Sequence, residues 1–170
     1  MAEEPKIEPP VPEQPPQSVG FLISQLGFFS SKRFAEALAP LEISPREFLL
    51  LRFVAASAGQ SQQALGQRLG VPPSRMVVLV DELEAAGLVE RRPDPDDRRV
   101  RGLHLTRRGG GILRRAAEIA IDYERELCAP LEEGERERLL ELLQKVQGAQ
   151  TGLRGVHPGL HQEHPGPTAG

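Results

Sequence analysis

The residues in this sequence best suited to binding another molecule are five arginines within an eleven-residue stretch. They flank or occupy a segment rich in proline and aspartate: Arg91, Arg92, Arg98, Arg99 and Arg101. A guanidinium group is charged at neutral pH and matches the geometry of a phosphate group. The cluster therefore predicts contact with a polyanion such as nucleic acid.

The net charge of the whole chain hides this cluster. The formal charge is −3 at pH 7, but residues 60–115 contain eleven arginines against seven acidic residues, a local charge of +4. The remainder of the chain therefore has a charge of −7. Local charge, rather than the total, governs attraction to phosphate, so the sequence predicts a basic module on an acidic frame.

Two short helical patterns precede the arginine cluster. Ser61 can cap a helix that runs to Leu69, and Gly70 permits a left-handed turn after it. Pro73 suits the first position of a second helix, which Gly87 ends. The helical spacing predicts one packed face on that second helix: Met76, Val77, Leu79, Val80 and Leu83. Two helices joined by a tight turn form a helix-turn-helix.

Two strand-like runs follow, at residues 88–92 and 100–105. The loop between them, residues 93–97, is rich in turn-forming residues and too polar to pack inside. A helix-turn-helix followed by a basic two-stranded wing is a winged helix. The predicted fold class is therefore mainly α, a winged helix-turn-helix with a two-stranded wing and long terminal helices.

The motif pieces of this stretch fall in a definite order. Gly87-Leu88-Val89-Glu90-Arg91 comes first, then Asp97-x-Arg99, five residues, Leu105-Thr106 and Gly109. This set closely resembles the signature of the MarR family of transcriptional regulators, and a looser resemblance extends over about residues 18–147. The resemblance implies a DNA-binding lobe at 44–106 and dimerisation helices at 18–41 and 112–147.

The predicted DNA-binding residues lie at the start of the second helix and in the wing. They are Ser74, Arg75, Val77, Val78, Asp97, Arg98, Arg99 and Arg101. Arg75 can make a bidentate contact to guanine, and Ser74 can reach a phosphate or a base. Many family members have a threonine and an arginine where this chain has Val77 and Val78, so two polar contacts are lost, although an apolar residue can touch a thymine methyl group.

The role of the wing is expected from the resemblance and from electrostatics. The resemblance implies that Arg99 enters the minor groove while Asp97 holds it in place, and a narrow minor groove does attract arginine. The alternative is that these two residues form a surface ion pair that caps the hairpin. Contact with DNA is favoured over the ion pair because a hairpin this small has no core against which five arginines could pack.

Amphipathic helices are expected on both sides of the DNA-binding lobe. Residues 18–39 contain four of the six phenylalanines, which favours a dimer surface over ordinary core. Ser44 to Glu47 forms a capping box for a helix apolar almost all round, which should be buried. Thr106 can cap a long helix, but three glycines should delay its firm part until about Ile112, and a last helix begins at Glu133.

Both ends of the chain predict disorder, and other chemistry is poorly supported. Residues 1–17 are acidic and proline-rich, and residues 148–170 are rich in Gly, His and Pro. His157, His161 and His164 could suggest a metal, but no carboxylate or cysteine cluster joins them, so no metal or cofactor is expected. Cys128 could sense redox state, although a small buried apolar role is favoured.

The sequence therefore predicts a cytoplasmic, homodimeric regulator that binds a palindromic operator in double-stranded DNA. No nucleophile–base pair or phosphate loop indicates an enzyme, and no apolar run is long enough for a membrane span. The resemblance implies repression and release by a small apolar or aromatic effector. The alternative function is a winged-helix module that grips an acidic protein partner.

Overall fold

The computed structural model describes residues 18–93, 101–151 and 160 of the 170-residue chain. The two predicted tails therefore lie largely outside the described residues, and so does the wing tip, residues 94–100. The chain divides after Arg33 into two units. The first helix begins in the first unit and ends in the second.

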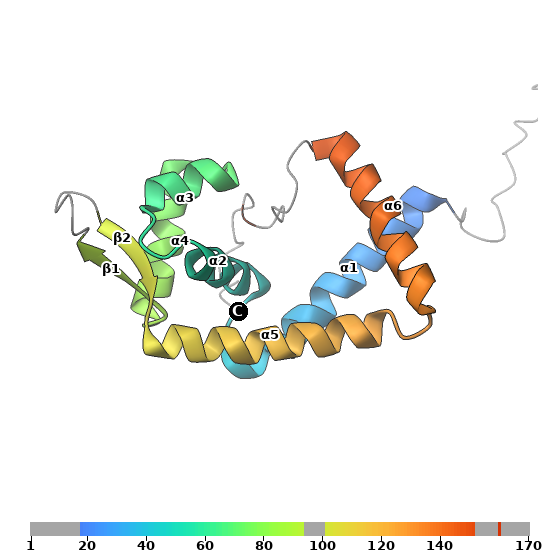
Figure 1. Cartoon of the computed structure of the whole chain (residues 1–170), viewed down its shortest axis with the longest axis horizontal. Helices are drawn as coiled ribbons and strands as arrows, with labels where there is room; N and C mark the ends of the chain where they lie inside the picture. Colours follow the sequence, from blue (N-terminus) through green and yellow to red (C-terminus); the bar gives the residue numbers. More distant parts are fainter. Residues whose placement is uncertain (1–17, 94–100, 152–159, 161–170) are drawn as a thin grey trace, which may run out of the picture. The chain divides into compact units, whose positions relative to one another are not determined.

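Six α-helices and one two-stranded sheet make up the described part of the chain (Figure 1). In order they are α1 (Val19–Leu38), the short 3-10 helix η1 (Ala39–Leu41), α2 (Pro45–Ala56), α3 (Gln62–Leu69), α4 (Pro73–Ala85), β1 (Val89–Pro93), β2 (Arg101–Leu105), α5 (Arg107–Leu127) and α6 (Glu133–Thr151). The predicted mainly-α chain with a helix-turn-helix and a two-stranded wing is confirmed.

Side-chain caps begin several of these helices where the sequence predicts them. The backbone N–H of Glu47 donates to Ser44 Oγ at 3.2 Å, and the Glu47 carboxylate accepts from the Ser44 N–H at 2.7 Å. Ser61 Oγ accepts from the N–H of Ala64 at 3.2 Å, and Thr106 Oγ1 from that of Gly109 at 2.9 Å. Each cap satisfies a donor that the first turn of a helix leaves without a partner.

The core of the second unit is built mainly from the helices and strands of residues 38–116. Its fully buried side chains include Leu50 and Leu51 of α2, Leu65 and Leu69 of α3, Met76, Leu79, Val80 and Leu83 of α4, and Val89 and Leu103 of the strands. Helix α2 packs against both α5 and β2. Helix α2 contributes to the core as predicted, but one side of it, with Arg52, Ala55 and Ala56, is exposed.

The strand β2 forms backbone hydrogen bonds along both of its edges. On one edge it pairs antiparallel with β1, in a register that places Val89 opposite Leu105. On the other, the N–H of Leu103 donates to Gln60 O and the Leu103 carbonyl accepts from the N–H of Gly59, both at 2.9 Å. A Cβ on Gly102 would lie 2.5 Å from the Gly59 oxygen. The wing is therefore fixed to the segment that leads into α3.

Helix α5 begins directly after its predicted Thr106 cap, but its firm part begins earlier than the predicted Ile112. Its first residue is Arg107, so all three glycines lie inside the helix rather than before its firm part. Gly109 is buried, and a Cβ at this position would overlap the carbonyl oxygen of Leu88 and lie 2.8 Å from the carbonyl carbon. Glycine is therefore needed there for close packing of α5 against the residue before β1, which offsets its low helix propensity.

The predicted C-terminal tail also begins later than residue 148. Helix α6 continues to Thr151, because alanine and glutamine favour helix and one glycine costs only about 1 kcal/mol. Leu160, inside the predicted tail, is fully buried and belongs to the core of the second unit. Burial of an apolar side chain thus holds one point of a segment whose composition favours disorder.

Two neighbouring glycines of α5 give a matched test of this packing. We expect Gly109→Ala to lower the free energy of unfolding by about 2 kcal/mol or more, as overpacking against backbone does. Gly110→Ala should raise it by about 0.5–1 kcal/mol, because a Cβ there meets no atom within 4 Å and alanine favours helix. Urea unfolding of both variants measures the difference. Similar effects of the two substitutions would show that Gly109 does not require its close contact.

Candidate nucleic-acid interface

The turn between α3 and α4 has the geometry of a helix-turn-helix. Gly70 adopts a left-handed conformation with φ of 64°, as predicted for the end of α3. Val71 is buried, and its N–H donates to the carbonyl of Gly66 at 2.9 Å. Helix α4 then begins at Pro73 with Pro72 at its N-cap, and among the described residues no side chain caps this end. The uncapped N–H groups leave the positive end of the helix dipole available to a phosphate.

Helix α4 has one buried face and one outward face. Met76, Leu79, Val80 and Leu83 are each only 1% exposed, whereas Val77 is 39% and Val78 47% exposed. The assignment of Val77 to the packed face is therefore wrong, because its position turns it outward beside Val78. Ser74 is exposed, while Arg75 is half-buried and already makes an interaction within the chain. The outward face thus presents Ser74, Val77 and Val78, three of the predicted DNA-binding residues.

The acidic residues of α4 lie in its second half, and each of them is paired with an arginine. The first turn contains no acidic residue. Arg46 of α2 donates to Glu82 at 3.0 Å, and Arg91 of β1 donates to both Asp81 and Glu84. Paired carboxylates repel phosphate less than free ones, so the helix can approach DNA despite three acidic residues.

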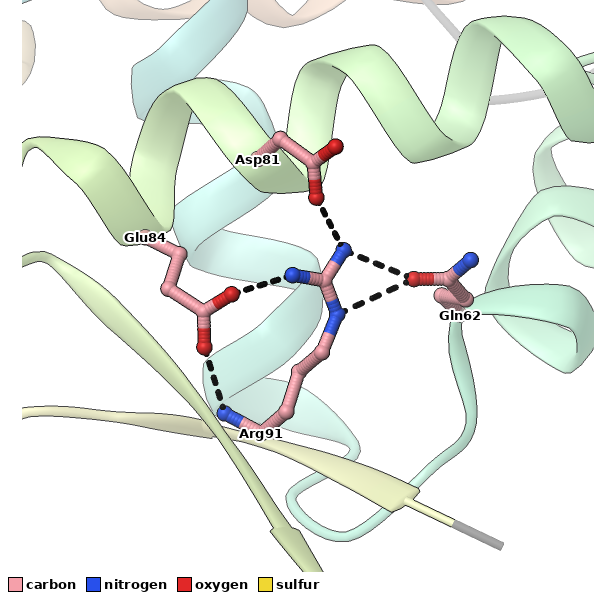
Figure 2. Close-up of polar contacts among 4 residues, drawn as sticks. All are labelled: Gln62, Asp81, Glu84 and Arg91. Atoms are coloured by element: carbon pink, nitrogen blue, oxygen red, sulfur yellow. Dashed lines mark hydrogen bonds and ion pairs between the residues drawn. The ribbon is translucent and has the colours of Figure 1, made fainter.

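Arg91 connects three elements through one guanidinium group (Figure 2). Its Nη2 donates to Asp81 at 2.6 Å and to Gln62 of α3 at 2.9 Å, while its Nη1 donates to Glu84. Its backbone N–H also donates to the Glu84 carboxylate at 3.2 Å. Partial burial lowers the pKa of Arg91, but the hydrogen bonds and charges of Asp81 and Glu84 outweigh it and raise the pKa above its ordinary value.

This arrangement corrects the idea that all five hairpin arginines lack an internal role. Arg91 serves the lobe itself, and sequence reasoning missed its partners. The sequence did contain a signal for these partners. Two acidic residues three apart on one helix face, Asp81 and Glu84, can bind one guanidinium from a following strand.

Of the remaining hairpin arginines, the structure describes Arg92 and Arg101 but not Arg98 and Arg99. Arg92 is exposed and donates to Glu90 at 2.6 Å, and Arg101, at the start of β2, is exposed and lies opposite Pro93. Asp97, Arg98 and Arg99, predicted as DNA-binding residues, lie outside the described residues. The described base of the wing therefore has two exposed arginines, Arg92 and Arg101.

The two arginines at the start of α5 have different environments. At the first turn of a helix, where the dipole disfavours cations, an arginine can contact a DNA phosphate or solvent. Arg108 donates to the carbonyl of Ala86 at 2.6 Å, so it caps the C-terminal end of α4, where the helix dipole favours a cation. Arg107 is exposed and keeps both alternatives open.

Comparison with known proteins agrees with this geometry. The model of the MarR family matches residues 41–100. A putative transcriptional regulatory protein for the hcr operon of Thauera aromatica is 30% identical over 135 residues, covering 75% of this chain and 81% of that protein. The solved structure of the transcriptional repressor CouR bound to a 23-mer DNA duplex is 29% identical with a TM-score of 0.68, covering 77% of this chain and 93% of that one. The chain belongs to the MarR family of winged helix-turn-helix transcriptional regulators.

A second MarR structure was solved with a small molecule. The Mycobacterium tuberculosis MarR family protein Rv2887, in complex with p-aminosalicylic acid, is 26% identical with a TM-score of 0.59. The match covers 98% of that chain and 76% of this one. Solved structures of this family thus contain DNA in one case and an aromatic acid in another.

A hollow with a volume of about 1110 Å³ lies in the second unit of this MarR protein. Helices α2 and α5 and the start of α6 form its walls, with apolar side chains that include Phe48, Leu113 and Ile121. Cys128 lies on the same wall, half-buried rather than fully buried, and its thiol donates to Glu124 at 3.7 Å. Three arginines also line the hollow: Arg52, Arg125 and Arg136.

Two further observations concern other classes of function. None of the helices in the described part of the chain is long and apolar enough to cross a membrane. Among the described residues no group of three or more His, Cys, Asp or Glu side chains could hold a metal ion. His157, His161 and His164 lie outside the described residues.

Replacement of Arg91 tests its role in holding α3, α4 and β1 together. We expect Arg91→Lys to lower the free energy of unfolding by about 1–2 kcal/mol, because an ammonium lacks the planar fork of five donors that binds two carboxylates and an amide together. The loss should stay below that of a buried pair, since Asp81 and Glu84 are 57% and 40% exposed. Arg92→Lys is the matched control and should change it by less than about 0.5 kcal/mol. Equal urea midpoints for the two variants would contradict this role.

Proposed function

We propose that two copies of this chain form a dimer that binds a palindromic operator and represses transcription until a small ligand releases it. The observation that carries the proposal is the outward face of α4, which has no acid in its first half and only arginine-paired acids in its second. The N-terminal residues of such a helix enter the major groove. The DNA-bound CouR structure, with 93% of its length covered, supports the same mode of binding.

Apolar side chains on two terminal helices support the dimer. In α6 the exposed large apolar residues are Leu139, Leu140, Leu142, Leu143 and Val146, each 42–57% exposed. In α1 they include Leu26, Phe28 and Phe29, each 55–70% exposed. Exposed apolar surface of this extent marks a site of association. A two-fold dimer presents two α4 helices to half-sites about one DNA turn apart, which is why the operator should be palindromic.

The hollow between α2 and α5 supports an aromatic carboxylate as the releasing ligand. The walls of this hollow come from α2, α5 and the start of α6. Arg125 and Arg136 pair with Asp122 and Glu124, whereas no described acidic residue forms an ion pair with Arg52. Arg52 lies 5.8 Å from the Phe48 ring centroid, so a carboxylate and an aromatic ring can be bound side by side.

Release of DNA then follows from conformational preference. The hollow joins α2, which packs on the lobe through β2, to α5. A ligand can shift the protein only toward the conformation that it binds more tightly. We propose that this conformation has an α4-to-α4 spacing that no longer matches the major groove, so that ligand and operator compete without sharing a site.

DNA binding across a salt series tests the proposed interface. The full chain should bind DNA from upstream of its own gene more tightly than scrambled DNA. Arg99→Ala should weaken binding to both and flatten the logarithmic salt dependence by about one unit per contact, because a phosphate-field contact is lost. Arg75→Ala should mainly reduce the preference for operator, since contacts to base edges specify sequence. Arg138→Ala on α6 removes the same charge and should change neither property.

The same measurements separate the proposal from its alternative. Wild-type salt slopes for Arg99→Ala would remove the wing from the interface. An absence of DNA binding by the wild-type chain, at salt concentrations where it is folded, would favour the module that grips an acidic protein partner.

Ligand control is tested with salicylate as the carboxylate probe and benzyl alcohol as the uncharged control. Salicylate should raise the melting temperature of the free protein and weaken operator binding, as any ligand of one conformation does. Benzyl alcohol should do so much less. Arg52→Ala should weaken the apparent affinity for salicylate, obtained from the melting-temperature shift, by at least about tenfold. This factor is the equivalent of one charge-assisted hydrogen bond. Arg138→Ala should retain it, and equal responses of both variants would exclude Arg52 as the carboxylate partner.

A further inference from the structure

Two adjacent valines on the outward face of α4 have no structural role that the described residues reveal. Val77 and Val78 are 39% and 47% exposed, while the opposite face of the helix supplies four residues that are 1% exposed. Exposed β-branched residues also favour helix less than alanine or lysine does. The pair therefore adds neither core packing nor helix stability, which leaves recognition as its use.

The surroundings of the valines narrow what they can recognise. Val77 lines a shallow hollow of about 350 Å³ between α3 and the start of α4, together with Pro72, Pro73 and the glutamines Gln63 and Gln67. The lining of this hollow combines apolar side chains with the uncharged amides of glutamines. No acidic residue lies in the first turn of α4, so the patch can approach a phosphate backbone without repulsion.

The chemistry of a valine side chain allows one kind of contact to base edges in the major groove. Isopropyl groups neither donate nor accept hydrogen bonds, so they cannot distinguish the polar edges of guanine, adenine or cytosine. The methyl group on C5 of thymine is the apolar feature that the major groove displays, and it packs well against an aliphatic side chain. We infer that Val77 and Val78 read thymine methyl groups in each half-site of the operator.

This inference rests on the proposed DNA-binding function and adds its specificity. The valines occupy the outward positions next to Arg75 and Ser74, which can form polar contacts to bases or phosphate. Recognition by this helix is then divided between polar contacts at its start and apolar contacts one turn later. The operator should have thymines at fixed positions of each half-site, on whichever strand faces the valines.

The first experiment finds the operator and then removes single methyl groups from it. Selection from random duplex DNA with the full chain should yield a palindrome with invariant thymines in each half. Replacement of one such thymine by uracil keeps the base pair and removes only the methyl group. We expect about fourfold weaker binding for each methyl lost from contact with a valine, the equivalent of one buried methylene group. Replacement in both half-sites should weaken binding by about fifteenfold.

The second experiment assigns those methyl groups to the valines with a double-mutant cycle. Val77→Ala and Val78→Ala should weaken binding to thymine operator about fourfold but leave binding to the matching uracil operator almost unchanged. Arg75→Ala is the matched control and should lose the same factor on both operators. Alanine at positions 77 and 78 should not lower the melting temperature, because both sites are exposed and alanine favours helix.

Each outcome separates this inference from the proposed function. Failure of the chain to select or bind any DNA overturns the proposed function. Selection of an operator with no uracil-sensitive thymine overturns the inference and leaves the function intact. A thymine effect that persists unchanged in both alanine variants also overturns it, because the methyl groups would then contact other residues.

Discussion

The guanidinium of Arg91 is the interaction on which the geometry of the DNA-binding lobe depends. It binds one side chain of α3 and two of α4, and it comes from the first strand of the wing. Helices α3 and α4 already share apolar packing, but apolar contacts allow small rotations that change where an outward side chain points. Directional hydrogen bonds to two carboxylates and an amide fix that rotation, so the orientation of α4 is linked to the position of β1.

The same interaction also shapes the electrostatics of the outward surface. Asp81 and Glu84 would otherwise place two unpaired negative charges on the helix that we propose enters the major groove. Arg46 neutralises the third, Glu82, from a different helix. The basic character of the lobe therefore arises from two sources: arginines that are exposed, such as Arg92 and Arg101, and arginines that cancel acids. A count of charges along residues 60–115 combines the two and cannot tell them apart.

Local sequence signals predicted most of the fold, and contacts between distant residues account for what they missed. Each helix cap joins a side chain to a backbone N–H only three residues later, so the caps can be recognised from sequence: Ser44, Ser61 and Thr106. The regular first turn of α5 was missed because Gly109 packs against Leu88, twenty-one residues earlier in the chain. Val77 was assigned to the packed face because the helical repeat gives only the approximate direction of each side chain around the helix axis. The boundary between the packed and outward faces depends on which elements pack against α4. The roles of Asp97 and Arg99 stay predictions.

The pairing of β2 on both edges also bears on how the molecule avoids joining others of its kind. A free strand edge exposes N–H and C=O groups that can pair with a second sheet, and an isolated two-stranded hairpin has two such edges. Here the segment at residues 59–61 covers one of them. The remaining edge belongs to β1, a five-residue strand that ends in Arg92 and Pro93. Charge, proline and short length each discourage edge-to-edge pairing, so this edge is a poor template for aggregation.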